Sequence, residues 1–185
     1  MNHPLKLGGI LFLLTAICVG ILGAVNTVTS PIIKRNEMAS EEKAMKTLIT
    51  EAESFESAEE IQDEIVKKVF LAKKGMDTVG YVLRLEPNGY GGAIKLLIGV
   101  DKEGNIKGIR ILEHSETPGF GANADKDSFK NQFANRNTPL KVTKSNPDVD
   151  EIEAITGATI TTTAVTDAVN IAAQYILDHQ VEWGA

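Results

Sequence analysis

An apolar run near the N-terminus constrains this chain most, because its surroundings must differ from those of the rest of the sequence. Residues 7–33 carry no charge, and residues 7–25 are almost wholly apolar. At about 1.5 Å per residue, about 20 such residues cross the roughly 30 Å hydrocarbon core of a bilayer. A cleaved signal peptide would have a shorter apolar region, of about 7–15 residues, before a small-residue cleavage site. We therefore predict one uncleaved N-terminal transmembrane helix, in an anchor of residues 1–34.

Composition limits what the remaining residues can do. The chain has 185 residues and is 43% hydrophobic, which allows one modest domain with its own core beside the anchor. Its net charge is -6 and no basic cluster stands out, so nucleic acid is not an expected partner. The single cysteine, Cys18, lies in the apolar run. This excludes a disulfide framework or a cysteine-based metal site within one chain, and we predict no metal.

The flanking charges leave the orientation of the anchor open. Lys6 precedes the apolar run, and Lys34 and Arg35 follow it. Cytoplasmic flanks are enriched in Lys and Arg, so the pair at residues 34–35 by itself favours a cytoplasmic C-terminal domain. Because positive charge flanks both ends, charge alone does not decide the orientation.

A helical linker region is predicted for residues 35–78. Ser40 can cap a helix, and Glu41 and Glu42 suit the positive end of its dipole. The acidic stretch of residues 51–63 is typical of a solvated helix or loop.

Three strands with short connections follow. Strand-like patterns cover residues 81–85, 94–100 and 106–112, with turn signals at residues 87–89 and 101–105. Consecutive strands joined by short turns pair antiparallel. We then expect a short helix at residues 125–135, a loop at residues 137–150, and a last helix from about Thr162. In the short helix Asp125 is the expected cap, and Phe129 and Phe133 share a face. The pattern predicts an α+β domain of residues 79–185, an antiparallel sheet with flanking helices.

Two segments carry candidate chemistry. Residues 153–161 read Glu-Ala-Ile-Thr-Gly-Ala-Thr-Ile-Thr, a small, hydroxyl-rich turn before a helix. Small residues admit a bulky group, and the helix start favours an anion, so the segment suits a phosphate; a plain cap and tight turn is the alternative. Residues 114–121 read His-Ser-Glu-Thr-Pro-Gly-Phe-Gly, in which Pro-Gly indicates a type II turn with exposed backbone groups.

Together the two segments closely resemble the FMN-binding domain of the G subunit of the Rnf electron-transport complex. A related domain occurs in the C subunit of the sodium-pumping NADH:quinone reductase. The resemblance covers about residues 80–177, and the N-terminal helix also fits. It implies FMN bound covalently, by a phosphoester to the last threonine of the S/T-G-A-T motif, which is Thr159 here. The family motif usually begins with Asp, and Glu153 keeps that carboxylate with a longer reach.

The resemblance also suggests which residues contact the flavin. Capping alone is the alternative for Thr156 and Thr161, and a structural turn with a core phenylalanine is the alternative for the Pro-Gly segment. The predicted cofactor-binding residues are Thr159, Thr156, Gly157, Ala158, Ile160, Thr161, Glu116, Thr117, Gly119 and Phe120.

The implied function is electron transport. As a member of this family the chain would be a single-pass flavoprotein subunit of a translocating, Rnf-type ferredoxin:NAD oxidoreductase. It would relay electrons through FMN, contribute to ion transport, and have no independent catalytic site. Its flavin domain would lie on the extracytoplasmic side of the cell membrane. Its partners would be the other membrane subunits of the complex and a flavin transferase for maturation.

Two other functions stay open. One is the C subunit of the sodium-pumping quinone reductase, or another FMN-carrying respiratory protein; the Glu-Thr-Pro-Gly segment and the modest length favour the Rnf-type subunit. The other is a flavin-free anchored scaffold, which would not need a hydroxyl at Thr159.

Overall fold

The computed structural model describes residues 3–61, 64–179 and 183. The chain forms two compact units, Met1–Glu41 and Glu42–Ala185. The first unit consists mainly of α1 (His3–Leu48), whose last residues belong to the second unit; α1 is long and apolar enough to cross a membrane, by length and composition. Its most apolar window has a mean hydropathy of 2.4, and none of that window is buried in protein. The predicted transmembrane helix therefore has a matching helix in the structure.

The helix continues beyond residue 34, the predicted end of the anchor. α1 is continuous from His3 to Leu48, so Ser40 lies inside it and caps nothing. Residues 32–48 contain neither glycine nor proline, and most of them are good helix formers. With no residue to end it, the helix continues through the charged stretch.

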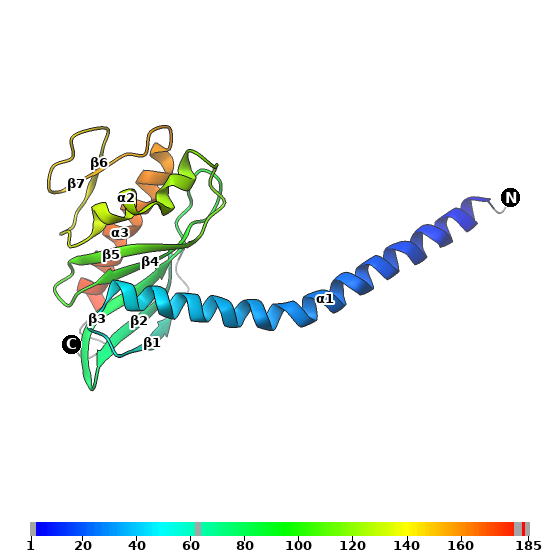
Figure 1. Cartoon of the computed structure of the whole chain (residues 1–185), viewed down its shortest axis with the longest axis horizontal. Coiled ribbons are helices and arrows are strands. Elements are labelled where there is room, and N and C mark those ends of the chain that lie inside the picture. Colours follow the sequence, from blue (N-terminus) through cyan, green and yellow to red (C-terminus); the bar gives the residue numbers. More distant parts are fainter. Residues whose placement is uncertain (1–2, 62–63, 180–182, 184–185) are drawn as a thin grey trace. The chain divides into compact units, whose positions relative to one another are not determined.

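The second unit is built on a five-stranded antiparallel sheet, with its strands in sequence order (Figure 1). Glycine and aspartate shape the tight turns: Gly75 has a φ of +61°, and the carboxylate of Asp101 accepts the backbone N–H groups of Glu103 and Asn105. The predicted antiparallel sheet is confirmed. Its strands are β1 (Ser54–Glu60), β2 (Val66–Lys74), β3 (Asp77–Leu85), β4 (Lys95–Val100) and β5 (Ile106–Glu113).

The predicted helical linker of residues 35–78 is wrong after Leu48. β1 and β2 lie in that region and belong to the same sheet as β3, so residue 79 is not a structural boundary. β1 is an edge strand whose glutamate-rich sequence is typical of a solvated loop, although Phe55 and Ala58 pack against the core. Asp63, the end of the acidic stretch, lies outside the described residues.

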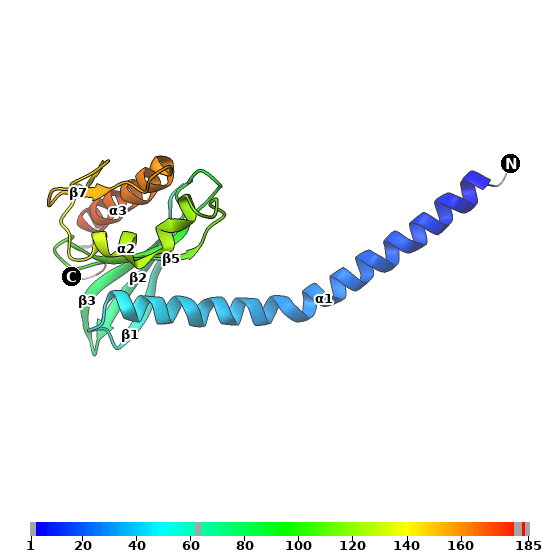
Figure 2. The same ribbon diagram turned by 45° about the horizontal axis from the view of Figure 1, so that its top comes forward.

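Each face of the sheet has an apolar cover. α3 (Thr159–His179) packs its buried stripe, which includes Val165, Val169 and Ile176, on one face. Met45 and Leu48, in the last turns of α1, pack on the opposite face. Figure 2 shows α3 on one side of the sheet and the end of α1 on the other.

Short elements connect β5 to α3. The expected helix at residues 125–135 is a series of single turns, η1 (Gly121–Asp125), α2 (Asp127–Lys130) and η2 (Asn131–Phe133). Asp125 is not its cap; its carboxylate pairs with Lys130 at 3.0 Å. Phe129 and Phe133 do share a face, with an edge-to-face ring contact at 5.2 Å.

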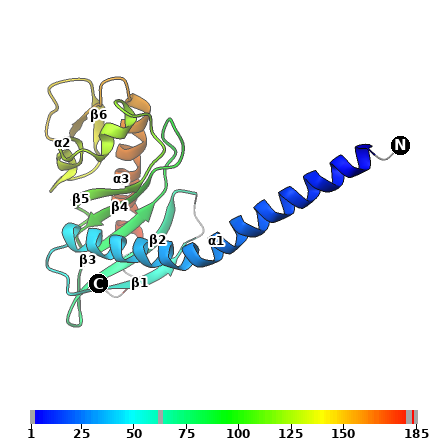
Figure 3. The ribbon, with the colours of Figure 1, turned by 45° about the vertical axis from the view of Figure 1, so that its right-hand side comes forward.

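The expected loop at residues 137–150 contains a strand. β6 (Lys141–Thr143) pairs in parallel with β7 (Glu151–Glu153), and Figure 3 shows β6 near the N-terminal part of α3. Three-residue strands are too short to leave an alternating pattern in a Pro/Asn/Asp-rich sequence. β7 ends at Glu153, so the β6–β7 pair fixes the chain shortly before α3 begins.

The core residue Tyr81 allows a direct prediction about stability. Tyr81 is fully buried, its hydroxyl has no hydrogen-bond partner among the described residues, and burial raises the pKa of that hydroxyl. Because an unpaired buried polar group is costly, Tyr81→Phe is expected to raise the free energy of unfolding by about 1 kcal/mol. The phenyl ring can keep the contact with Trp183, whose centroid lies 5.9 Å away. Urea unfolding measures the change, and a loss of stability would show that the hydroxyl does have a partner.

Candidate cofactor-binding site

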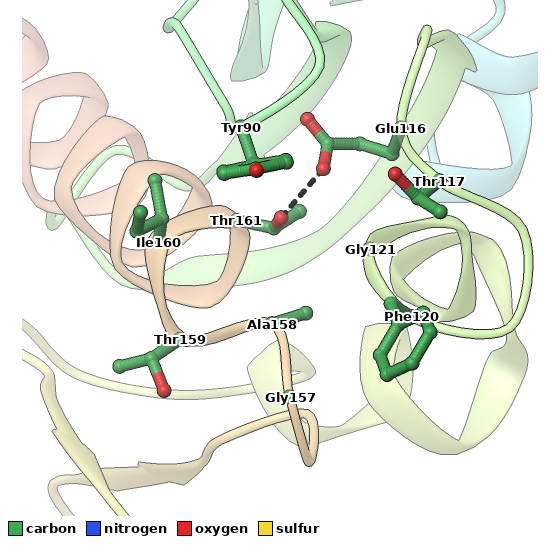
Figure 4. Close-up of a pocket in the computed structure, with 10 residues that line it drawn as sticks. All are labelled: Tyr90, Glu116, Thr117, Phe120, Gly121, Gly157, Ala158, Thr159, Ile160 and Thr161. Atoms are coloured by element: carbon green, nitrogen blue, oxygen red, sulfur yellow. Dashed lines mark hydrogen bonds between the residues drawn. The ribbon is translucent and has the colours of Figure 1, made fainter.

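A cavity of about 580 Å³ lies between three segments of the second unit (Figure 4). The segments are the β3–β4 loop, the turns that follow β5, and the start of α3. The lining residues are Tyr90, Glu116, Thr117, Phe120, Gly121, Gly157, Ala158, Thr159, Ile160 and Thr161. Its volume lies within the range of cofactor and ligand pockets.

The turn of residues 154–158, called the β7–α3 turn below, forms one wall. At its start the Ala154 N–H donates to the Thr143 carbonyl at 2.8 Å, and near its end the Ala158 N–H donates to the Ile155 carbonyl at 2.9 Å. Gly157 has a φ of +77°, and a Cβ there would lie 2.7 Å from the ring of Phe120. Glycine is therefore required at this position by both backbone conformation and space.

The last helix begins at Thr159, three residues before the predicted start. The hydroxyl of Thr162 does not cap the helix: it accepts the Ile155 N–H at 3.1 Å and donates to the Ala158 carbonyl at 3.0 Å. Thr162 thus ties the β7–α3 turn to the first turn of the helix. A run of β-branched threonines is a poor helix signal in sequence, which explains why the predicted start of the helix lies three residues too far along the chain.

Thr159 lies at the positive end of a long helix. α3 has 21 residues, and its first N–H groups have no partners within the helix. The Thr159 side chain is exposed and lines the cavity. Among the lining residues, which are all described, none is a lysine or arginine. The helix terminus is therefore the positive group that the cavity offers to an anion.

Glu116 joins the three walls. Its side chain is buried, with 6% of its surface exposed. One carboxylate oxygen, Oε1, accepts the Gly91 N–H at 2.9 Å, and the other, Oε2, accepts the Thr161 hydroxyl at 2.7 Å. Its own backbone N–H donates to Nδ1 of His114 at 3.2 Å. One carboxylate therefore connects the β3–β4 loop, the segment after β5 and the first turn of α3.

Glycines make room for this carboxylate. A Cβ at Gly89 or at Gly121 would collide with a carboxylate oxygen of Glu116, and a Cβ at Gly91 would collide with the Ser115 carbonyl. Glycine is therefore needed in two distant segments for the same reason: in both, the backbone passes close to Glu116 or its neighbour.

The predicted turn after β5 is present. The Phe120 N–H donates to the Thr117 carbonyl at 3.2 Å, and Gly119 has a φ of +82°, as a type II turn requires at its third position. Phe120 is 53% exposed, so the alternative of a core phenylalanine is wrong. Tyr90 and Ile160 are also exposed, and Figure 4 shows these three side chains around the Glu116–Thr161 hydrogen bond.

The structure brings most of the predicted residues together, although their contacts with a flavin stay predictions. Thr156 and Gly119 are not among the lining residues. Tyr90 and Gly121 line the cavity but were not predicted. The signal in the sequence was an aromatic residue between two glycines, at residues 89–91, but the same triplet is equally typical of a plain turn.

Comparisons with known proteins identify the family. The FMN-binding domain family matches residues 89–174, and the RnfG N-terminal region matches residues 1–48. The G subunit of the proton-translocating ferredoxin:NAD(+) oxidoreductase complex of Clostridium ljungdahlii is 38% identical over 84% of this chain and 82% of that protein. The G subunit of the Na(+)-translocating ferredoxin:NAD(+) oxidoreductase complex of Acetobacterium woodii is 33% identical, over 91% and 89%.

A solved structure supports the fold. NqrC of Shewanella oneidensis aligns with a TM-score of 0.50 at 18% identity, over 70% of this chain and 73% of that one. The similarity confirms the α+β fold class, and the sequence relatives confirm the predicted family. The chain therefore belongs to the family of G subunits of Rnf-type ion-translocating oxidoreductase complexes, with an N-terminal RnfG region and an FMN-binding domain.

Proposed function

We propose that this chain is the electron-carrying G subunit of a membrane-bound Rnf-type complex, with FMN bound covalently through its phosphate to Thr159. The FMN-binding domain and the relatives that are G subunits of such complexes support the electron-transfer role. When bound, FMN supplies the redox chemistry, and the protein supplies binding, orientation and electrostatics. As in the relatives, the complex would couple electron flow to ion translocation.

One observation carries the choice of Thr159: of the three threonines in residues 153–161, it alone is both exposed and in the cavity lining. Thr156 is exposed but does not line the cavity. Thr161 is fully buried, and its hydroxyl donates to Glu116. A phosphate on Thr159 would also lie at the helix terminus, where the dipole and free N–H groups favour it.

The other lining residues fit the rest of FMN. Tyr90, Phe120 and Ile160 are exposed apolar side chains that can cover the faces of a planar ring. Thr117 and the backbone at Gly121 and Gly157 offer polar groups beside small side chains, which allow a ring edge to approach. The residues present are therefore of the types that a bound flavin needs.

The apolar helix α1 and the membrane-complex relatives support a membrane location. We place the flavin domain on the extracytoplasmic side, where covalent attachment prevents loss of the cofactor into an aqueous compartment. The partners are the other membrane subunits of the complex and, for maturation, a flavin transferase. Alkaline phosphatase fused after Ala185 is expected to be active, since it folds outside the cytoplasm; an inactive fusion beside an active cytoplasmic reporter would reverse this orientation.

The flavin proposal is tested with the full chain produced together with a flavin transferase. The expected result is a fluorescent band on a denaturing gel, with an intact mass raised by one FMN less one water. Peptide mapping should place the added mass on the peptide that contains Thr159. A wild-type chain without bound flavin in this experiment would overturn the proposal and favour the flavin-free scaffold.

A further inference from the structure

We propose that Gln132 is a positioning residue for the flavin-acceptor segment: its side-chain amide holds the backbone of Glu153, and so fixes where the β7–α3 turn begins. The proposal rests on the proposed flavin attachment at Thr159. Gln132 lies in η2, outside both sequence segments that suggested the site, and it does not line the cavity.

The contact pairs one amide with both backbone groups of one residue. The Glu153 N–H donates to Oε1 of Gln132 at 2.7 Å, and Nε2 of Gln132 donates to the Glu153 carbonyl at a longer 3.4 Å. Glu153 is the last residue of β7, which pairs with β6. The glutamine amide thus acts on Glu153 as a neighbouring strand would, and the shorter bond is the stronger one.

Arg136 secures the same segment at the other end of β7. Its Nε donates to the Gln132 carbonyl at 2.9 Å, and its Nη1 donates to the Val149 carbonyl. The backbone of Arg136 is in turn bridged to Ile106 of β5 in both directions, at 2.8 and 3.1 Å. The side chains of Gln132 and Arg136 therefore bracket β7 and connect it to the main sheet.

The β7–α3 turn is consequently held on both sides. Before it, Gln132 holds Glu153, next to the hydrogen bond from the Ala154 N–H to the Thr143 carbonyl, and within it Thr162 holds Ile155 and Ala158. The exposed residues Thr156 and Gly157 lie between these points. A segment held in one conformation loses less entropy when a modifying enzyme binds it, so release of Glu153 should slow the attachment of flavin.

The chain contains a matched control. Asn170 of α3 holds Leu140 by the same chemistry: the Leu140 N–H donates to Oδ1 at 2.7 Å, and Nδ2 donates to the Leu140 carbonyl at 2.9 Å. This second amide contact fixes the chain just before β6. Its loss should lower stability without freeing the β7–α3 turn.

The test compares wild type, Gln132→Met and Asn170→Leu in the full chain. Hydrogen exchange of the flavin-free proteins reports on the amides of residues 153–158. Gln132→Met is expected to speed that exchange about five- to tenfold, the population change that one net hydrogen bond corresponds to. The initial rate of covalent flavin attachment, at limiting transferase, should fall by a similar factor. Gln132→Glu, which keeps the acceptor for the Glu153 N–H, should lie between wild type and Gln132→Met in both measurements.

Asn170→Leu should lower the melting temperature yet leave both local exchange and attachment rate near those of wild type. Unchanged exchange at residues 153–158 in Gln132→Met would overturn the proposal. The proposal would also be overturned if Asn170→Leu slowed flavin attachment as much as Gln132→Met does at an equal loss of stability. Gln132 would then act only through the stability of the whole unit. The exchange measurement needs no flavin. A wild type that never acquires flavin would therefore overturn the attachment at Thr159, while the exchange result would still decide whether Gln132 holds the turn.

Discussion

Thr159→Ala is expected to abolish covalent flavin attachment while leaving the fold of the second unit intact. The substitution removes the one hydroxyl of residues 153–161 that is both exposed and in the cavity lining. It should cost little stability, within about 0.5 kcal/mol, because the side chain is exposed and alanine is a good helix former. In-gel fluorescence and intact mass measure the flavin, and circular dichroism during heating measures the fold.

Two further variants make this prediction specific. Thr159→Ser keeps a hydroxyl on the same backbone atom and should retain flavin. Thr156→Ala should also retain it, since Thr156 is equally exposed in the β7–α3 turn but lies outside the cavity lining. Flavin that persists on Thr159→Ala and disappears from Thr156→Ala would move the attachment to Thr156 and contradict the geometric argument.

Local sequence predicted the two walls of the cavity that are continuous in the chain. The segments at residues 114–121 and 153–161 each carry their own turn chemistry, and both turns are present. The third wall, with Tyr90, is joined to them through the buried carboxylate of Glu116. A hydrogen bond between residues 25 positions apart leaves no periodic signal, so Tyr90 could not be assigned from pattern alone.

The same distinction explains the errors in the fold. β3, β4 and β5 have buried, β-rich patterns between clear turns, and they were predicted. β1 is an acidic edge strand, and in β2 a short apolar centre lies between the lysine pairs at residues 67–68 and 73–74. β1 pairs with β2 and β2 pairs with β3, so the assignment of both strands depends on sheet pairing, which outweighs local propensity.

Glu116→Ala is expected to destabilise the second unit and to loosen the cavity together. The variant leaves the Gly91 N–H and the buried Thr161 hydroxyl without their acceptor. Gly91 is exposed and its N–H can bond to water, whereas an unsatisfied buried hydroxyl costs about 1–3 kcal/mol, so the free energy of unfolding should fall by about 1–3 kcal/mol. Because the same carboxylate joins three walls, flavin attachment should also fall. Urea unfolding of the flavin-free protein and the attachment rate of the folded fraction measure the two effects separately.

Glu113→Ala is the matched control, three residues away in the chain. Glu113 pairs with Lys95 at 2.6 Å across β4 and β5, and this hydrogen bond lowers the pKa of its carboxyl and raises that of the Lys95 ammonium. The Glu113 side chain is 64% exposed, so loss of this pair should cost less than about 1 kcal/mol. Glu116→Gln keeps an acceptor for the Gly91 N–H, so its loss of stability should lie between those of Glu116→Ala and Glu113→Ala. If Glu116→Ala costs no more than Glu113→Ala, the carboxylate does not hold the walls together, and the glycines around it would need another explanation.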